Sequence, residues 1–241
     1  MAEKISQEPE YESTFSAQSL IVLFLAIATG TLLAVTLIPT WLPNLTASLM
    51  GTDPKAFWYL SRGTAFVSMS LLWVSMAFGL TITNKMARLW PGAPTAFAIH
   101  EFVSLLGLAF AMFHGLILMG DHYINFTLAQ VAVPFASVGF KPLWVGIGQI
   151  GFYVWAIVAA SFYIRSRIGH KTWRAIHFAS FLSYAAALAH GITSGTDTSA
   201  IWAQWYYWIS GSSLLFLLMY RVIYSLSPTV LARTTVQRIV E

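Results

Sequence analysis

The sequence predicts an all-helical integral membrane protein, a bundle of six transmembrane helices with both termini in the cytoplasm. Of its 241 residues, 57% are hydrophobic and only 9% are charged, whereas soluble domains carry about 25% charged residues. Six apolar segments are each long enough to cross a bilayer, which takes about 20 residues. Most of the basic residues fall in the loops between these segments or in the tails, a placement that indicates membrane topology and not nucleic-acid binding.

The predicted spans form a single bundle, and no other segment is long enough for a second domain. In chain order they cover residues 20–39, 57–82, 95–119, 143–163, 173–193 and 202–224. Residues 1–15 carry four Glu and one Lys, which fits a polar tail and not a signal peptide. We expect this tail, a membrane domain at residues 16–226 and a cytoplasmic tail at residues 227–241.

Aromatic residues mark the predicted boundaries of the spans, as Trp and Tyr do at membrane interfaces. Trp41 follows the first span, Trp58 lies at the start of the second, and Trp90 precedes the third. Trp144 and Tyr163 lie at the two ends of the fourth span, and Trp173 begins the fifth. Trp202 and Tyr220 lie near the two ends of the sixth. Each span therefore has at least one expected interfacial anchor.

The distribution of basic residues predicts the orientation. If the N-terminus is cytoplasmic, ten of the 13 Lys and Arg residues lie inside, namely Lys4, Lys85, Arg88, Arg165, Arg167, Lys171, Arg174, Arg221, Arg233 and Arg238. Only Lys55, Arg62 and Lys141 then lie outside. Cytoplasmic loops carry the excess of Lys and Arg, so this asymmetry predicts that both termini are cytoplasmic.

Four histidines lie within the apolar spans, where a polar group is costly and by default indicates a functional site. His100 and His114 belong to the third span, and His177 and His190 to the fifth. Both spans run outward, so we expect His100 beside His177 at the inner depth and His114 beside His190 at the outer depth. Their spacings of 14 and 13 residues correspond to about 21 and 19.5 Å of helix rise.

Paired histidines on two parallel helices can hold two haems, because imidazole at both axial positions gives six-coordinate iron suited to electron transfer. The chain has no cysteine, which excludes iron–sulfur clusters and covalent haem attachment. A 13-residue step turns about 140° on an ideal helix, so the fifth span must tilt, overwind or present its ligands from different sides of the porphyrins. The other interpretations are inter-helical hydrogen bonds or a metal-ion path. Gly107 lies midway between His100 and His114, and its small size has two interpretations: it would let a macrocycle approach the backbone, or it serves ordinary helix packing.

The pattern His100-x13-His114 followed by His177-x12-His190 resembles the ferric-reductase-like transmembrane domain family. That family includes NADPH oxidases, ferric reductases and the membrane subunit of periplasmic methionine sulfoxide reductases. The resemblance extends to Leu60-Ser61-Arg62-Gly63-Thr64 and Pro142-Leu143-Trp144-Val145-Gly146, and in all covers roughly residues 57–224. It implies two non-covalent b-type haems with the four histidines as axial iron ligands. Oxidase and reductase members carry an FAD and NADPH domain after the last span, whereas here about 17 residues follow Tyr224. A separate partner or quinol is therefore expected to supply electrons.

Other polar residues have two interpretations each. Arg62, near the outer pair, could bind a haem propionate or extend to the outer interface. Arg174, three residues before His177, could bind propionates of the inner haem or serve only the positive-inside rule. Glu101 could relay a proton to a quinone site or pair with Arg174. The apolar loop at residues 121–141 could cap the outer haem or shape a quinone pocket.

We therefore expect the membrane cytochrome b subunit of an oxidoreductase, which transfers electrons between the two faces of a bacterial inner (plasma) membrane through two stacked haems. Its expected partners are the bilayer, quinone, and a separate flavoprotein or larger redox complex; no catalytic residue is assigned. One alternative is a self-sufficient reductase of ferric iron or another outer acceptor. Another, of a different class, is a haem-free structural or assembly subunit or a metal transporter. An absorption spectrum separates the haem and haem-free classes.

Overall fold

The computed structural model describes residues 13–41, 56–121 and 124–226, and all regular structure within these ranges is helical. In chain order the elements are α1 (Ala17–Trp41), α3 (Ala56–Thr83), η1 (Met86–Arg88), α4 (Ala93–Ile117), η2 (Leu118–Gly120), α5 (Leu128–Ala132), α6 (Pro142–Tyr163), α7 (Arg165–Ile168), α8 (His170–Ser194) and α9 (Ile201–Ser225). Both predicted tails lie largely outside the described residues. So do four of the basic residues counted above: Lys4, Lys55, Arg233 and Arg238.

Five of the described helices, α1, α3, α4, α6 and α8, are long and apolar enough to cross a membrane. The prediction of an all-helical membrane protein is therefore confirmed. The sixth predicted span also forms a helix, α9, with 25 residues. It contains three Trp and four Tyr, amphipathic side chains that are enriched at membrane interfaces.

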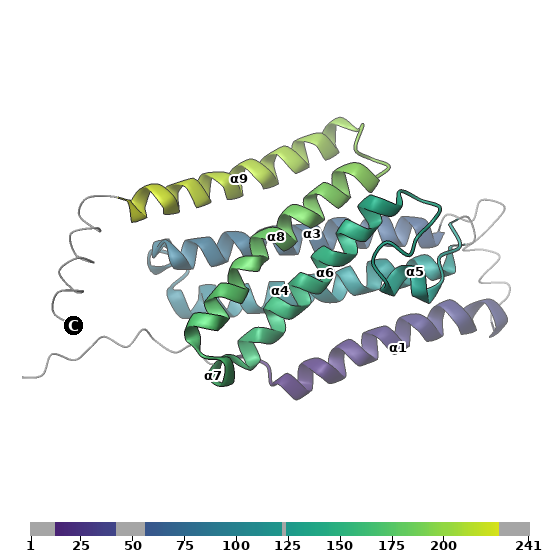
Figure 1. Cartoon of the computed structure of the whole chain (residues 1–241), viewed down its shortest axis with the longest axis horizontal. Coiled ribbons are helices and arrows are strands. Elements are labelled where there is room, and N and C mark those ends of the chain that lie inside the picture. The colour runs from purple at the N-terminus through teal and green to yellow at the C-terminus, as the bar shows by residue number, and fades with distance from the viewer. Residues whose placement is uncertain (1–12, 42–55, 122–123, 227–241) are drawn as a thin grey trace, which may run out of the picture.

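Two helix hairpins form the centre of the molecule (Figure 1). The pair α3–α4 and the pair α6–α8 have by far the most extensive contacts, and α4 also packs on α6. Helix α1 lies along α4 on one side of this four-helix centre, whereas α9 lies along α3 on the opposite side. The buried centre between the hairpins includes Leu72, Leu108, Trp155 and Tyr184, one from each of the four helices.

The described chain begins and ends at the same end of the bundle, the end that carries η1 and α7 (Figure 1). The backbone N–H of Thr14 donates to Glu101 near the start of α4 at 2.8 Å. At the end of α9, Arg221 Nη1 donates to the carbonyl of Thr83 at 3.4 Å. We call this the α7 end, and the opposite end, which carries α5, the α5 end.

Candidate functional site

The structure brings the four predicted histidines together in two pairs. At the α7 end, the ring centroids of His100 and His177 are 6.1 Å apart, with ring planes at 69°. Towards the α5 end, those of His114 and His190 are 6.2 Å apart, with ring planes at 73°. Metal–imidazole bonds are about 2.0–2.1 Å long, so a metal lies roughly 3 Å from the centre of each ring that binds it. Each pair therefore has the separation of two imidazoles that share one ion.

Helix α3 supports the histidines of α4 through serines at a seven-residue interval. Three serines face three positions of α4 that are also seven residues apart: Ser75 faces His100, Ser68 faces Gly107, and Ser61 faces His114. A step of seven residues is close to two helical turns, so each series lies on one face of its helix. The antiparallel hairpin keeps the two series in register over both histidine levels.

The contacts of Ser61 and Ser75 orient the two imidazoles of α4. Nδ1 of His114 lies 2.8 Å from the carbonyl oxygen of Ser61 and 2.8 Å from its hydroxyl oxygen. Nδ1 of His100 lies 2.8 Å from the carbonyl oxygen of Ser75 and 3.1 Å from its hydroxyl. A carbonyl oxygen only accepts, so Nδ1 carries the proton in both rings. The lone pair of Nε2 is then free to bind a metal, which is the usual arrangement of metal-bound histidines.

His190 is held in the same way by α6. Its Nδ1 donates to the carbonyl oxygen of Trp144 at 2.9 Å. The ring lies against Gly148, where a Cβ atom would come within 2.6 Å of Nδ1. A side chain at position 148 would therefore displace the imidazole, and the glycine is required by this close approach and not by its backbone angles.

His177 is supported differently from the other three histidines. Its ring packs on Trp173 of the same helix, with centroids 5.3 Å apart, and has no hydrogen-bond partner among the described residues. Both histidines of α8 pair with a histidine of α4. They differ in their second contact, because His190 donates to a carbonyl of α6 whereas His177 packs on Trp173 of its own helix.

The rings of His114 and His190 line a cavity of about 490 Å³ with mostly apolar walls. Cofactor sites are typically about 300–1,000 Å³ in volume. The apolar loop after α4 contributes through α5, whose residues Gln130 and Val131 line the cavity. Gln149 Nε2 donates to the carbonyls of both residues at 2.7 Å. The loop thus lies beside this pair of histidines.

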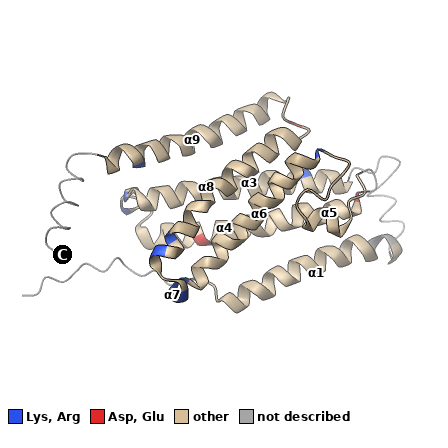
Figure 2. Ribbon diagram, viewed as in Figure 1, with Lys and Arg blue, Asp and Glu red and all other residues tan. Residues whose placement is uncertain are grey.

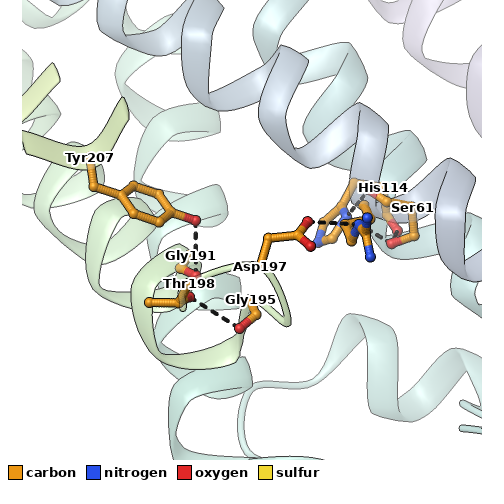
Figure 3. A network of polar contacts seen from close by, with 8 residues as sticks. Ser61, His114, Gly191, Gly195, Asp197, Thr198 and Tyr207 are labelled. Atoms are coloured by element: carbon orange, nitrogen blue, oxygen red, sulfur yellow. Dashed lines mark hydrogen bonds and ion pairs between the residues drawn. The ribbon is translucent and has the colours of Figure 1, made fainter. Parts of the chain in front are cut away.

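Arg62 also lines this cavity, and it forms an ion pair with Asp197 in the connection between α8 and α9. The distance from Nε to Oδ2 is 2.8 Å, and the two side chains are 36% and 18% exposed. Figure 3 shows Asp197 extending towards Ser61 and His114 from the loop that also carries Gly195 and Thr198. Asp197 could not be predicted from the sequence, because a single acidic residue in a loop is ordinary.

The remaining predicted residues lie at the α7 end. Arg174 is exposed on α8, on the helix that carries His177. Glu101 is buried, and its carboxylate accepts hydrogen bonds from the Tyr163 hydroxyl at 2.9 Å and from the backbone N–H of Thr14 at 2.8 Å. The suggested pairing of Glu101 with Arg174 is therefore wrong, because the carboxylate faces α6 and the start of the chain.

Gly107 packs against a side chain of the protein. A Cβ atom at this position would come within 2.7 Å of the Trp155 indole. Trp155 is buried between the two histidine levels, and its Nε1 donates to Ser104 at 3.2 Å. Of the two interpretations of Gly107, the structure supports close helix packing.

Two buried polar atoms near the histidine pairs have no hydrogen-bond partner among the described residues. They are Nε1 of Trp173, beside His177, and Oε1 of Gln149, beside the cavity. The described part of the chain contains no cluster of three or more His, Asp or Glu side chains that could hold a metal ion. Each level offers two imidazoles, so a metal there would take its other ligands from a non-protein group.

Comparison of the chain with known protein families, with curated proteins and with solved structures gave no match.

Proposed function

We propose that this chain is a six-span membrane cytochrome b that transfers electrons between the two membrane faces through two b-type haems. The observation that carries the proposal is the pairing of His100 with His177 and of His114 with His190, at ring separations of 6.1 and 6.2 Å. The proposal agrees with the resemblance to ferric-reductase-like transmembrane domains.

The described residues fit haem in three respects. Two imidazoles at each level would occupy the axial positions of an iron whose other ligands come from the porphyrin. The apolar cavity of about 490 Å³ beside His114 and His190 suits a flat hydrophobic cofactor. The buried Trp173 Nε1–H, which has no acceptor among the described residues, would suit a propionate oxygen at the other level.

Haem supplies one-electron redox chemistry when bound, and the protein's own residues hold and orient it. Ser61, Ser75 and Trp144 accept from Nδ1 of three of the histidines, which fixes the tautomer and the ring orientation. Such outer contacts also make the imidazole a more basic ligand. Two histidines would hold each haem, which would leave no position open for oxygen and would favour electron transfer.

We further propose that α9 is the sixth span and that the α7 end faces the cytoplasm. Helix α9 has 25 residues, enough to cross a hydrocarbon core of about 30 Å, and it runs beside α3. Five exposed basic residues lie at the α7 end: Lys85, Arg88, Arg167, Lys171 and Arg174. By the positive-inside rule this end is cytoplasmic. The chain would then act as the membrane subunit of a bacterial inner-membrane redox complex, with quinol or a separate flavoprotein as donor.

An absorption spectrum and a haem assay of the purified protein test the proposal. We expect two haems per chain, all released by acidic acetone because no cysteine is present to bind them covalently. We also expect that the reduced protein does not form a carbonyl adduct rapidly, because both axial positions are filled. Absence of haem would favour a structural subunit or metal transporter, and rapid carbon monoxide binding would favour a terminal reductase of an outer acceptor.

A further inference from the structure

Three aromatic rings on one side of α8 lead from the surface of the protein to the His100–His177 pair. His170 is exposed at the start of the helix. Its ring centroid lies 5.2 Å from that of Trp173, which in turn lies 5.3 Å from that of His177. Positions 170, 173 and 177 share one helix face because they are three and four residues apart. The last ring is 6.1 Å from His100.

The surface around His170 is basic. Arg167, Lys171 and Arg174 are exposed on α7 and the first turns of α8. Figure 2 shows Lys and Arg gathered at this corner, where α7 joins α8. We call these three residues together with His170 the α7 corner.

Among the described residues, no exposed carboxylate offsets this positive charge. The acidic residues in these ranges are Glu101, Asp121 and Asp197. Glu101 is buried at 7% exposure, and both of its oxygens already accept hydrogen bonds. Asp121 is buried at 2% exposure at the other end of α4, and Asp197 pairs with Arg62.

We infer that the α7 corner is the docking surface for an acidic redox protein, which delivers electrons to the His100–His177 pair along the rings of His170, Trp173 and His177. This inference rests on the proposed function, and it selects a soluble redox protein as the electron donor. A positive surface speeds encounter with an acidic partner and orients it. The row of rings is the reason to choose a redox protein over lipid headgroups, since its exposed end, His170, belongs to the same basic surface.

The electron balance of the step is simple. With haem bound, a reduced flavin on the partner would lose one electron to the site that His100 and His177 form. No bond forms or breaks, and the side chains of His170 and Trp173 lie along the path without being oxidised or reduced themselves.

Charge reversal tests the docking surface, with reduced flavodoxin as the acidic flavoprotein probe and the full chain in a neutral detergent. The affinity of flavodoxin for the membrane protein is measured over a series of salt concentrations. The double variant Arg167→Glu/Lys171→Glu should bind on the order of tenfold more weakly at low salt, with a flatter salt dependence, because rim charges act through long-range attraction. The matched control is Lys85→Glu/Arg88→Glu, which reverses two exposed charges at the same end of the bundle but on η1. It should bind as the parent protein does.

The ring path is tested at His170, which is exposed and does not contact the histidine pairs. Transfer within the flavodoxin complex should slow severalfold in His170→Leu and stay near the parent rate in His170→Phe, which keeps a ring. Equal rates in the two variants would overturn the path.

Equal flavodoxin binding by both charge-reversal variants would overturn the docking surface and assign these side chains to anionic lipid headgroups. A protein without haem would instead refute the proposed function, and the binding comparison would still judge the docking surface.

Discussion

At the residue scale, the main feature is that three of the four intramembrane histidines are fixed by backbone carbonyls of a neighbouring helix. Ser75 holds His100, Ser61 holds His114 and Trp144 holds His190. A polar group in hydrocarbon is costly unless it has a partner, so one ring nitrogen is satisfied by the protein. Nδ1 thus holds each of these rings in place, whereas Nε2 has a lone pair that could bind a ligand.

The pairing of the histidines makes a first prediction. His114→Ala or His190→Ala should remove one spectral component, and His100→Ala or His177→Ala the other, because among the described residues each of these rings pairs with one other histidine. Low-temperature difference spectra of the four variants measure this. If His114→Ala and His177→Ala depleted the same component and left the other intact, the pairing would be wrong.

A second prediction concerns the close approach of Gly148 to His190. Gly148→Ala should lower haem occupancy at the His114–His190 level, because its Cβ would lie 2.6 Å from the imidazole Nδ1. The control is Gly63→Ala, whose Cβ meets nothing within 4 Å and which should keep both haems. Haem content per chain, measured after purification, decides the matter. Full occupancy in Gly148→Ala would mean that the ring can move without losing its ligand.

At the element scale, each central hairpin is pinned midway by a serine that bonds to a glycine carbonyl. On α3, Ser68 Oγ donates to Gly107 O at 2.8 Å, and on α8, Ser183 Oγ donates to Gly151 O at 2.8 Å. Small residues let helix backbones approach closely in membranes. In both hairpins this contact lies seven residues from a held histidine, His114 and His190 respectively, so helix packing and ligand placement share one register.

The third prediction therefore addresses this contact. Ser68→Ala should destabilise the folded protein by about 1 kcal/mol, since inter-helical hydrogen bonds in membranes contribute roughly 0.6–2 kcal/mol. Ser212→Ala is the control, because Ser212 is exposed and its hydroxyl reaches only Ile209 of its own helix at 3.5 Å. The free energy of unfolding in mixed micelles measures both. Equal stability of the two variants would argue that close packing alone sets the register of the α3–α4 hairpin.

At the scale of the whole molecule, the two hairpins stand side by side with α1 and α9 on opposite flanks (Figure 1). The described chain starts and finishes at the α7 end. A described chain that starts and finishes at the same end agrees with an even number of membrane crossings, as expected if all six long helices span the membrane. This arrangement puts exposed basic residues from η1 and its N-cap, from α7 and from α8 at one end of the bundle.

The fourth prediction tests whether α9 spans the membrane. The chain has no native cysteine, so a single introduced thiol reports its own location. Ser199→Cys, before α9, should react with an impermeant maleimide added outside intact cells. Ser225→Cys, at the end of α9, should react only after the cells are opened. Both positions are exposed in the structure. Labelling of both thiols from the same side would show that α9 does not cross.

The sequence alone determined the features that depend on local composition. Hydrophobic content along the chain located the helices, since burial in lipid depends on the residues of each segment itself. Helix α3 (Ala56–Thr83) and α9 (Ile201–Ser225) agree closely with the spans predicted at residues 57–82 and 202–224. Helix rise along parallel spans also predicted which histidines meet.

Only the tertiary structure decided how each helix is rotated and what it touches. The serine partners of His100 and His114, the Asp197 partner of Arg62 and the Trp144 partner of His190 all depend on packing between distant segments. The close approach of Gly148 and the carbonyl of Trp144 fix His190 against α6, a contact that no local property of the sequence encodes.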